Sequence, residues 1–173
     1  MPAFIEQYSI LFKSLSTGVH SFNFMLNTRL FEHFDNPECP GGTFSVDLEL
    51  DKKSHLLSLS FTFSGEATVI CDRCLDEFSL PLEFNSRLFV RFGEEVMETD
   101  ADVIYLDPNE YKLNVAEYLF ETICLNLPVK RVHKSIENCN KEMISKLDKH
   151  RINPDEKGTD PRWDSLRDIK NKN

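Results

Sequence analysis

Hydrophobic and polar residues alternate along much of the first two thirds of the chain, and this period of two predicts β-strands. Leucine or phenylalanine occupies every second position of residues 57–63, with serine or threonine in between. Residues 44–50 repeat the pattern, and the polar link 51–54 predicts that the two runs form a hairpin. Such strands bury one face and expose the other, as is typical of antiparallel sheets.

Three further segments have strand-like patterns, namely residues 20–26, 66–71 and 78–92. Pro81 lies inside the last of them. Because proline has no N–H group for the strand ladder, we expect this part of the sheet to be an edge or a bulge. Residues 28–34 are predicted to form a short helix.

One longer helix is predicted over residues 114–127. Asn114 is a good N-cap, and Glu117 follows three positions later in a capping-box arrangement. We therefore predict an α+β fold in which a mostly antiparallel sheet of about five to seven strands packs against this helix. An incomplete barrel is the alternative arrangement of the same strands. The apolar stripe of the helix consists of Val115, Leu119, Ile123 and Leu127.

The length of 173 residues fits one domain with an appended tail. We assign residues 1–139 to a single α+β domain and residues 140–173 to a basic, partly flexible tail that orders on binding. No apolar stretch reaches the roughly 18 residues that a membrane-spanning helix needs. The first residues lack the basic leader of a secretory signal, and the five cysteines are an odd number. We therefore expect reduced thiols and a cytoplasmic protein without a membrane partner.

The net charge of −9 is unevenly distributed. Residues 1–129 contain 8 basic and 21 acidic residues, a net charge of −13, whereas residues 130–173 contain 12 basic and 8 acidic residues, a net charge of +4. An anionic partner would therefore bind the C-terminal quarter. Residues 94–110 contain seven acidic residues and no basic one, which predicts a solvated loop or, as the alternative, a site that attracts a basic partner.

A CxxC motif, Cys71 to Cys74, lies between two predicted strands. Two thiolates at this spacing can bind one metal ion, because the turn between them directs both sulfurs to one point. The same spacing occurs in thiol oxidoreductases, where a helix begins at the motif and lowers the pKa of the attacking thiol. Strand alternation follows Cys74 instead of a helix, so half of a zinc site fits this motif better than a redox pair.

A tetrahedral site needs two more ligands, and His133 and Cys139 are close enough in the sequence for one loop to provide both. Cys124 lies on the apolar side of the predicted helix, which favours a buried thiol without a ligand role. Cys39 lies in a Pro- and Gly-containing loop, where it is either a ligand or a bystander. Cys71, Cys74, His133 and Cys139 thus form a structural zinc site or, alternatively, only pack together.

No catalytic motif is recognisable in the sequence. There is no serine nucleophile elbow, no glycine-rich phosphate loop and no His-Glu-x-x-His pair. We therefore do not expect an enzyme or a small-molecule substrate.

Three segments, in the same order along the chain, resemble the YceD family, the large ribosomal RNA subunit accumulation proteins. The first is Val69–Leu75, which contains the CxxC motif. The second is Leu125–His133, which begins with the Leu-x-Leu-Pro that ends the predicted helix and finishes at His133, with Cys139 six residues later. The third is Asp160–Leu166 near the C-terminus. Many members have a second CxxC motif downstream, but here no partner cysteine follows Cys139.

The resemblance implies a bacterial cytosolic or plastid protein that is needed for the accumulation of 23S ribosomal RNA and is not known as an enzyme. It also places Cys71 and Cys74 at the motif cysteines and His133 and Cys139 at the downstream pair. We therefore expect a non-catalytic ribosome biogenesis factor that binds precursor RNA or a large-subunit assembly intermediate. The alternative is an acidic adaptor that chaperones a basic ribosomal protein.

Basic residues after the helix are the candidates for contact with RNA or another partner. On composition alone they could equally form a solvated basic tail. They are Lys130, Arg131, Lys134, Lys141, Lys146, Lys149 and Arg151.

Overall fold

The computed structural model describes residues 4–93, 102–151 and 162. The chain divides into two compact units, residues 1–133 and residues 134–173. The first unit is a mixed α+β structure with a mostly antiparallel sheet, which confirms the predicted fold class.

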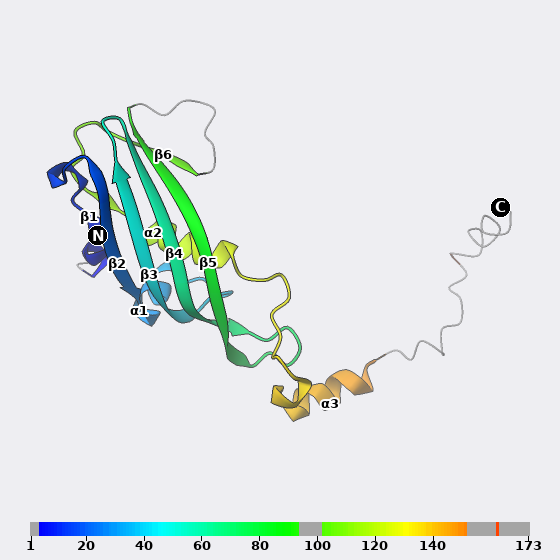
Figure 1. The fold of residues 1–173 in the computed structure, drawn as a ribbon. Coiled ribbons are helices and arrows are strands. Elements are labelled where there is room, and N and C mark those ends of the chain that lie inside the picture. The colour runs from blue at the N-terminus through cyan, green and yellow to red at the C-terminus, as the bar shows by residue number, and fades with distance from the viewer. Residues whose placement is uncertain (1–3, 94–101, 152–161, 163–173) are drawn as a thin grey trace. The chain divides into compact units, whose positions relative to one another are not determined.

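Five strands form the main sheet in the order β2-β3-β4-β5-β6 (Figure 1). The first four are antiparallel to their neighbours, whereas β6 runs parallel to the end of β5. Among the described strands β2 and β6 do not pair with each other, so the sheet is open and not a barrel. The bounds are Gly18–Leu26 for β2, Gly41–Lys52 for β3, Leu56–Ile70 for β4, Glu77–Phe92 for β5 and Val103–Leu106 for β6.

The predicted hairpin of residues 44–50 and 57–63 is present as part of β3 and β4, but residues 66–71 are not a separate strand. Strand β4 continues through Gly65 to Ile70. A Cβ atom at Gly65 would lie 2.2 Å from the Thr43 carbonyl oxygen and 2.7 Å from the Phe44 Cα atom. The glycine therefore does not end the strand but allows β3 to approach it closely.

Pro81 lies at a free sheet edge, as predicted. In β5 the N–H group of Phe89 donates to the Asp102 carbonyl, on the side of β6. Alternate residues of a strand direct their N–H groups to the same side, and the register with β4 is unbroken, so position 81 faces the same side as position 89. The absence of an N–H group at Pro81 therefore removes no hydrogen bond to β4.

Helices α1 (Thr28–Phe34) and α2 (Ala116–Leu125) lie on one side of the sheet (Figure 1). The α1 bounds match the prediction. Helix α2 is shorter than the predicted 114–127, and its N-cap is Val115. The Asn114 side chain accepts a hydrogen bond from the Ala116 N–H, and not from the Glu117 N–H as the predicted capping box requires. Of the predicted stripe, Leu127 is half-buried, and the fully buried members are Val115, Leu119 and Ile123.

Aromatic rings fill the space between the helices and the sheet. Phe120 of α2 stacks on Phe34 of α1 at 4.6 Å between ring centroids, and Tyr118 of α2 packs against Phe61 of β4 at 5.1 Å. A second, two-stranded sheet joins β1 (Ser9–Ile10) to β7 (Leu113–Asn114) and ties the N-terminal segment to the start of α2. Short 3-10 helices occupy Ile5–Tyr8 and Phe12–Ser14.

The acidic segment 94–110 is only partly the loop that the sequence predicted. Residues 103–106 form β6, whose four residues pair with the end of β5. Residues 94–101, which include four of the seven acidic residues, lie outside the described part of the chain. No described helix is both long and apolar enough to cross a membrane.

The second unit begins with a 3-10 helix at Ile136–Asn138 and continues with helix α3 at Lys141–Lys149. The Asn140 side chain caps α3 by accepting hydrogen bonds from the N–H groups of Glu142 and Met143. Part of the predicted tail is therefore helical, and residues 152–161 and 163–173 lie outside the described residues.

Candidate metal centre

The CxxC motif forms a tight turn between β4 and β5. The N–H of Leu75 donates to the Cys71 carbonyl at 2.8 Å, and the N–H of Cys71 donates to the Asp76 carbonyl at 2.9 Å. Leu75 has a φ of +65°, a left-handed conformation that the turn needs at this position. Both thiols of the motif are fully buried.

The segment after α2 is held against this turn by its backbone. The Asp72 N–H donates to the Arg131 carbonyl at 2.7 Å, and the Arg131 N–H donates to the Asp72 carboxylate at 2.6 Å. Two residues later the His133 ring packs on Phe78 of β5, with 4.7 Å between the ring centroids. These contacts bring the histidine to the CxxC turn from a distant part of the chain.

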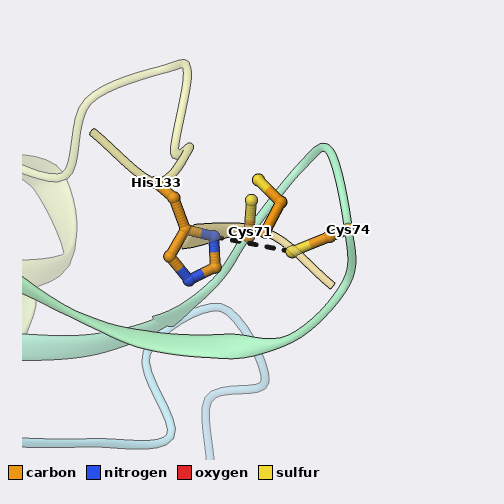
Figure 2. Close-up of side chains that lie close together, drawn as sticks. Cys71, Cys74 and His133 are labelled. Atoms are coloured by element: carbon orange, nitrogen blue, oxygen red, sulfur yellow. Dashed lines mark hydrogen bonds between the residues drawn. The ribbon is translucent and has the colours of Figure 1, made fainter. Parts of the chain in front are cut away.

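Figure 2 shows the His133 ring facing the two cysteines, with its Nδ1 atom 3.5 Å from the Cys74 sulfur. Zinc with tetrahedral ligands places a sulfur and a nitrogen about 3.6 Å apart and two sulfurs about 3.8 Å apart. The candidate ligand atoms of all four predicted residues, Cys71, Cys74, His133 and Cys139, lie within 4.8 Å of one another. Four ligand atoms this close together could share one metal ion.

The electrostatics of the turn favour a thiolate at Cys71. Burial raises the pKa of this thiol, but hydrogen bonds from backbone N–H groups outweigh burial and lower the pKa from 9.0 to about 6. A thiolate is the form of cysteine that binds metal ions. The donors that lower the pKa belong to His133, Arg73 and Cys74.

The chemistry of the donors fits zinc. Three thiols and one imidazole are a common set for structural zinc, and a set of this composition is a poor one for magnesium or calcium, which prefer oxygen ligands. A strand and not a helix follows Cys74, as the sequence predicted, so the low pKa of Cys71 comes from the turn itself. Burial of both thiols disfavours the exchange reactions of an oxidoreductase, which require access.

The other two cysteines lie outside this cluster. Cys39 is buried and Cys124 is half-buried, and contact between the two thiols raises the pKa of Cys39 and lowers that of Cys124. The Asn36 amide also donates to the Cys124 sulfur, at 3.7 Å. Cys39 therefore lies against Cys124 of α2 and not at the CxxC turn.

Arg131 is engaged within the first unit. Its guanidinium pairs with Glu38 at 3.2 Å and lies 4.0 Å from the Asp72 carboxylate, and the side chain is only 19% exposed. Sequence reasoning missed this contact and the roles of Asp72 and Phe78, because no spacing rule connects residues that lie so far apart in the chain. The remaining predicted contact residues are exposed, namely Lys130, Lys134, Lys141, Lys146, Lys149 and Arg151.

Two of these exposed residues form ion pairs within α3 and just after it. Lys146 pairs with Glu142 at 2.8 Å, and Arg151 pairs with Asp148 at 3.8 Å. Exposed pairs of this kind contribute little stability, typically about 0.5 kcal/mol or less, so an anionic partner can replace them at small cost.

Comparison with known proteins identifies a family. The family model for the large ribosomal RNA subunit accumulation protein YceD matches residues 59–170, which include the CxxC turn, His133, Cys139 and α3. Nothing matches among curated proteins or among solved structures. Because the match covers more than half of the chain, the protein belongs to the YceD family of large ribosomal RNA subunit accumulation proteins.

Proposed function

We propose that this protein is a non-catalytic ribosome biogenesis factor that supports the accumulation of 23S ribosomal RNA by binding precursor RNA or a large-subunit assembly intermediate in a bacterial cytoplasm. The observation that carries the proposal is the family match over residues 59–170, because the family is defined by a role in large-subunit RNA accumulation. The proposal assigns no catalytic residue.

The charge distribution supports RNA contact by the C-terminal part of the chain. Residues 1–129 carry a net charge of −13, and the first residues of the basic segment follow directly after α2. Phosphate groups are attracted to this segment and repelled by most of the first unit. The proposed RNA-contacting residues are Lys130, Lys134, Lys141, Lys146, Lys149 and Arg151, with Arg131 contributing through its position at the CxxC turn.

The proposed role of the metal is structural. A zinc ion held by Cys71, Cys74, His133 and Cys139 would fix the segment after α2 at the tip of the sheet, and so position Lys130 and Lys134 next to it. Metal ligands that lie far apart in sequence restrain the chain between them. The segment then loses less conformational entropy when it binds RNA. The bonds between Asp72 and Arg131 already favour the same position without metal.

The experiment is a binding titration with fragments of 23S ribosomal RNA at 50 and 200 mM salt. It compares the full-length protein with a variant that has glutamine at the six exposed basic positions and keeps all four proposed metal ligands. Each phosphate contact that is lost lowers the slope of log K against log salt by about 0.7 to 0.9. We expect the variant to bind at least tenfold more weakly at 50 mM salt and with a smaller slope.

The control is a variant with glutamine in place of Arg87 and Arg91, which lie on the outer face of β5. We expect it to bind RNA within about twofold of the unchanged protein, because it removes the same kind of charge from the first unit. Equal RNA binding by the six-residue variant would contradict the proposed contact residues. Absence of any RNA binding by the unchanged protein would contradict direct RNA contact as the mechanism.

A further inference from the structure

Strand β5 leaves a long edge unpaired. It is 16 residues long and pairs with β4 along residues 77–91, but on its other side β6 pairs only with residues 89–92. No described strand pairs with the edge of residues 77–85 on that side. We call these nine residues the β5 edge, and at about 3.3 Å per residue they span roughly 30 Å.

The direction of the backbone groups along the β5 edge follows from the register. Because the Phe89 N–H points toward β6, the N–H and carbonyl groups of the other odd-numbered residues point the same way. The outward donors include Glu83 and Asn85, and Pro81 contributes a carbonyl but no donor. Free donors and acceptors in alternation are the pattern that an added β-strand satisfies.

The opposite edge of the sheet differs, because the N-terminal segment contacts it. The same register points the odd-numbered backbone groups of β2 outward, and there the Tyr8 hydroxyl donates to the Met25 carbonyl at 3.4 Å. The Tyr8 ring also packs against Phe24, with 6.1 Å between the centroids. The β5 edge has no such contact from described residues along 77–85.

The two faces next to the β5 edge have different chemistry. On the inner face four large apolar side chains are only partly buried, since the helices cover the centre of the sheet. On the outer face Glu66, Glu77 and Glu83 are exposed, and no described lysine or arginine lies within salt-bridge distance of them. The apolar row consists of Phe78, Leu80, Leu82 and Phe84.

A shallow hollow lies on the outer face beside the edge. Its volume is about 490 Å³, and its lining includes Glu66, Pro81 and Glu83. Side chains of an added strand alternate between the two faces of a sheet, so one set would lie over the apolar row and the other would enter this acidic hollow. An occupant with alternating apolar and cationic side chains fits both.

We propose that the β5 edge binds an extended, lysine- or arginine-rich segment of a partner protein by strand addition. A single-stranded RNA fits poorly here, because its phosphates would meet carboxylates that form no salt bridge with a described lysine or arginine. Its backbone also lacks the N–H donors that the free carbonyls require. The residues of this site differ from the RNA-contacting residues proposed above. The two proposals can therefore fail independently.

The test is a fluorescence titration of the full-length protein with a labelled nine-residue peptide of alternating lysine and valine. The main variant is Asn85→Pro, which removes an outward donor and keeps the bonds to β4. The matched control is Ser21→Pro, which removes an outward N–H from β2 at the opposite edge. We expect Asn85→Pro to weaken binding about tenfold and Ser21→Pro to change it less than about twofold.

Charge and backbone contributions are separated by further arms of the titration. The double variant Glu77→Gln and Glu83→Gln is expected to weaken binding at least about fivefold, whereas Glu49→Gln on β3 changes it little. A peptide that is N-methylated at alternate residues keeps its charge but cannot pair on one side, and we expect it to bind about tenfold more weakly to the unchanged protein. This last arm holds even where a proline variant fails to fold.

Four results would overturn the proposal. The first is equal binding of the N-methylated and unmodified peptides, and the second is an equal loss of peptide affinity in Asn85→Pro and Ser21→Pro. The third is displacement of the peptide by a single-stranded RNA of nine nucleotides. The fourth is a dimer of the protein that Asn85→Pro dissociates. The first two would reduce the contact to charge attraction or general destabilisation. The third would assign the edge to RNA, and the fourth to a second copy of the chain.

Discussion

Two hydrogen bonds between Asp72 and Arg131 place the loop after α2 at the CxxC turn before any metal is considered. One is between backbone groups and the other uses the Asp72 carboxylate, so the aspartate contributes a donor and an acceptor. Contacts of this kind around a metal site orient the ligands, and their loss commonly costs a factor of 10 to 100 in metal affinity. At the residue scale, Asp72 therefore positions the loop that carries His133.

The first prediction concerns the proposed ligands. Purified, reduced protein should contain about one zinc ion per chain, and Cys74→Ser or His133→Ala should lower this to less than about 0.2, because three remaining donors bind zinc more weakly. Cys124→Ser is the control, since Cys124 lies outside the cluster, and it should keep its zinc. Elemental analysis of chelator-free preparations measures the content. Less than about 0.2 zinc in the unchanged protein would mean that the four side chains only pack together.

The second prediction concerns Asp72. Asp72→Ala should weaken zinc binding about tenfold in a competition titration with a chelator, because the loop that carries His133 loses its carboxylate contact. Glu38→Ala removes only an exposed ion pair with Arg131 and should change the affinity less than twofold. Equal effects of the two substitutions would show that the Asp72 carboxylate does not position the ligand.

The sequence was sufficient to select the four candidate ligands at residue scale. The CxxC spacing indicated a metal turn, and the position of His133 and Cys139 in one loop after the helix, together with the family resemblance, selected the other two ligands. The structure brings the ligand atoms of all four within 4.8 Å of one another. The hydrogen bonds of Asp72 and the contact of the His133 ring with Phe78 could not be predicted, because no sequence pattern specifies which groups of the returning loop meet the turn.

At the scale of elements, the alternation of apolar and polar residues predicted the strands well, whereas glycine was a poor indicator of where a strand ends. The period of two located β3, β4 and β5, since each has one buried and one exposed face. Gly65 separated two predicted strands, but it lies inside β4, where a Cβ atom would meet the backbone of β3. The segment 103–106 carries no alternation, and only its position beside the end of β5 makes it a strand.

The third prediction tests this close approach. In Gly65→Ala the new methyl group would collide with the backbone of Thr43 and Phe44, so we expect the free energy of unfolding to fall by about 2 kcal/mol or more. Thermal unfolding followed by circular dichroism should show a midpoint that is about 5 °C lower. Gly41→Ala is the matched control in the same sheet.

The control substitution should have a much smaller effect, because a Cβ at Gly41 would lie 3.3 Å from the Thr68 hydroxyl and meet side-chain atoms instead of backbone. A side chain can move by a few tenths of an ångström, whereas paired strands cannot separate without loss of hydrogen bonds. Similar midpoints for Gly65→Ala and the unchanged protein would contradict the steric explanation.

At the scale of the whole molecule, the division of charge separates two kinds of partner. The net charge of −9 by itself argues against RNA, but the chain combines a net −13 in residues 1–129 with a net +4 in residues 130–173. Sequence composition is sufficient to show this division. It could not show that the acidic part contains a free strand edge flanked by carboxylates, which depends on the pairing of β5.

A fourth prediction follows for complexes purified from cells. If the basic segment binds RNA and the β5 edge binds a basic protein, nuclease treatment should release ribosomal RNA from the full-length protein and leave any partner bound at the β5 edge. Asn85→Pro should release that protein and leave the RNA. Mass spectrometry and RNA quantification measure the two fractions, and simultaneous loss of both after nuclease would show that the protein contact depends on RNA.

The most direct test of the central claim is ultraviolet crosslinking in living cells that express the full-length protein, followed by sequencing of the attached RNA. We expect reads concentrated on the large-subunit ribosomal RNA or its precursor. We also expect these reads to fall at least about tenfold in the variant with glutamine at the six exposed basic positions. Ribosomal RNA reads at background level, together with protein crosslinks that survive nuclease, would contradict direct RNA binding and identify the protein as an adaptor instead.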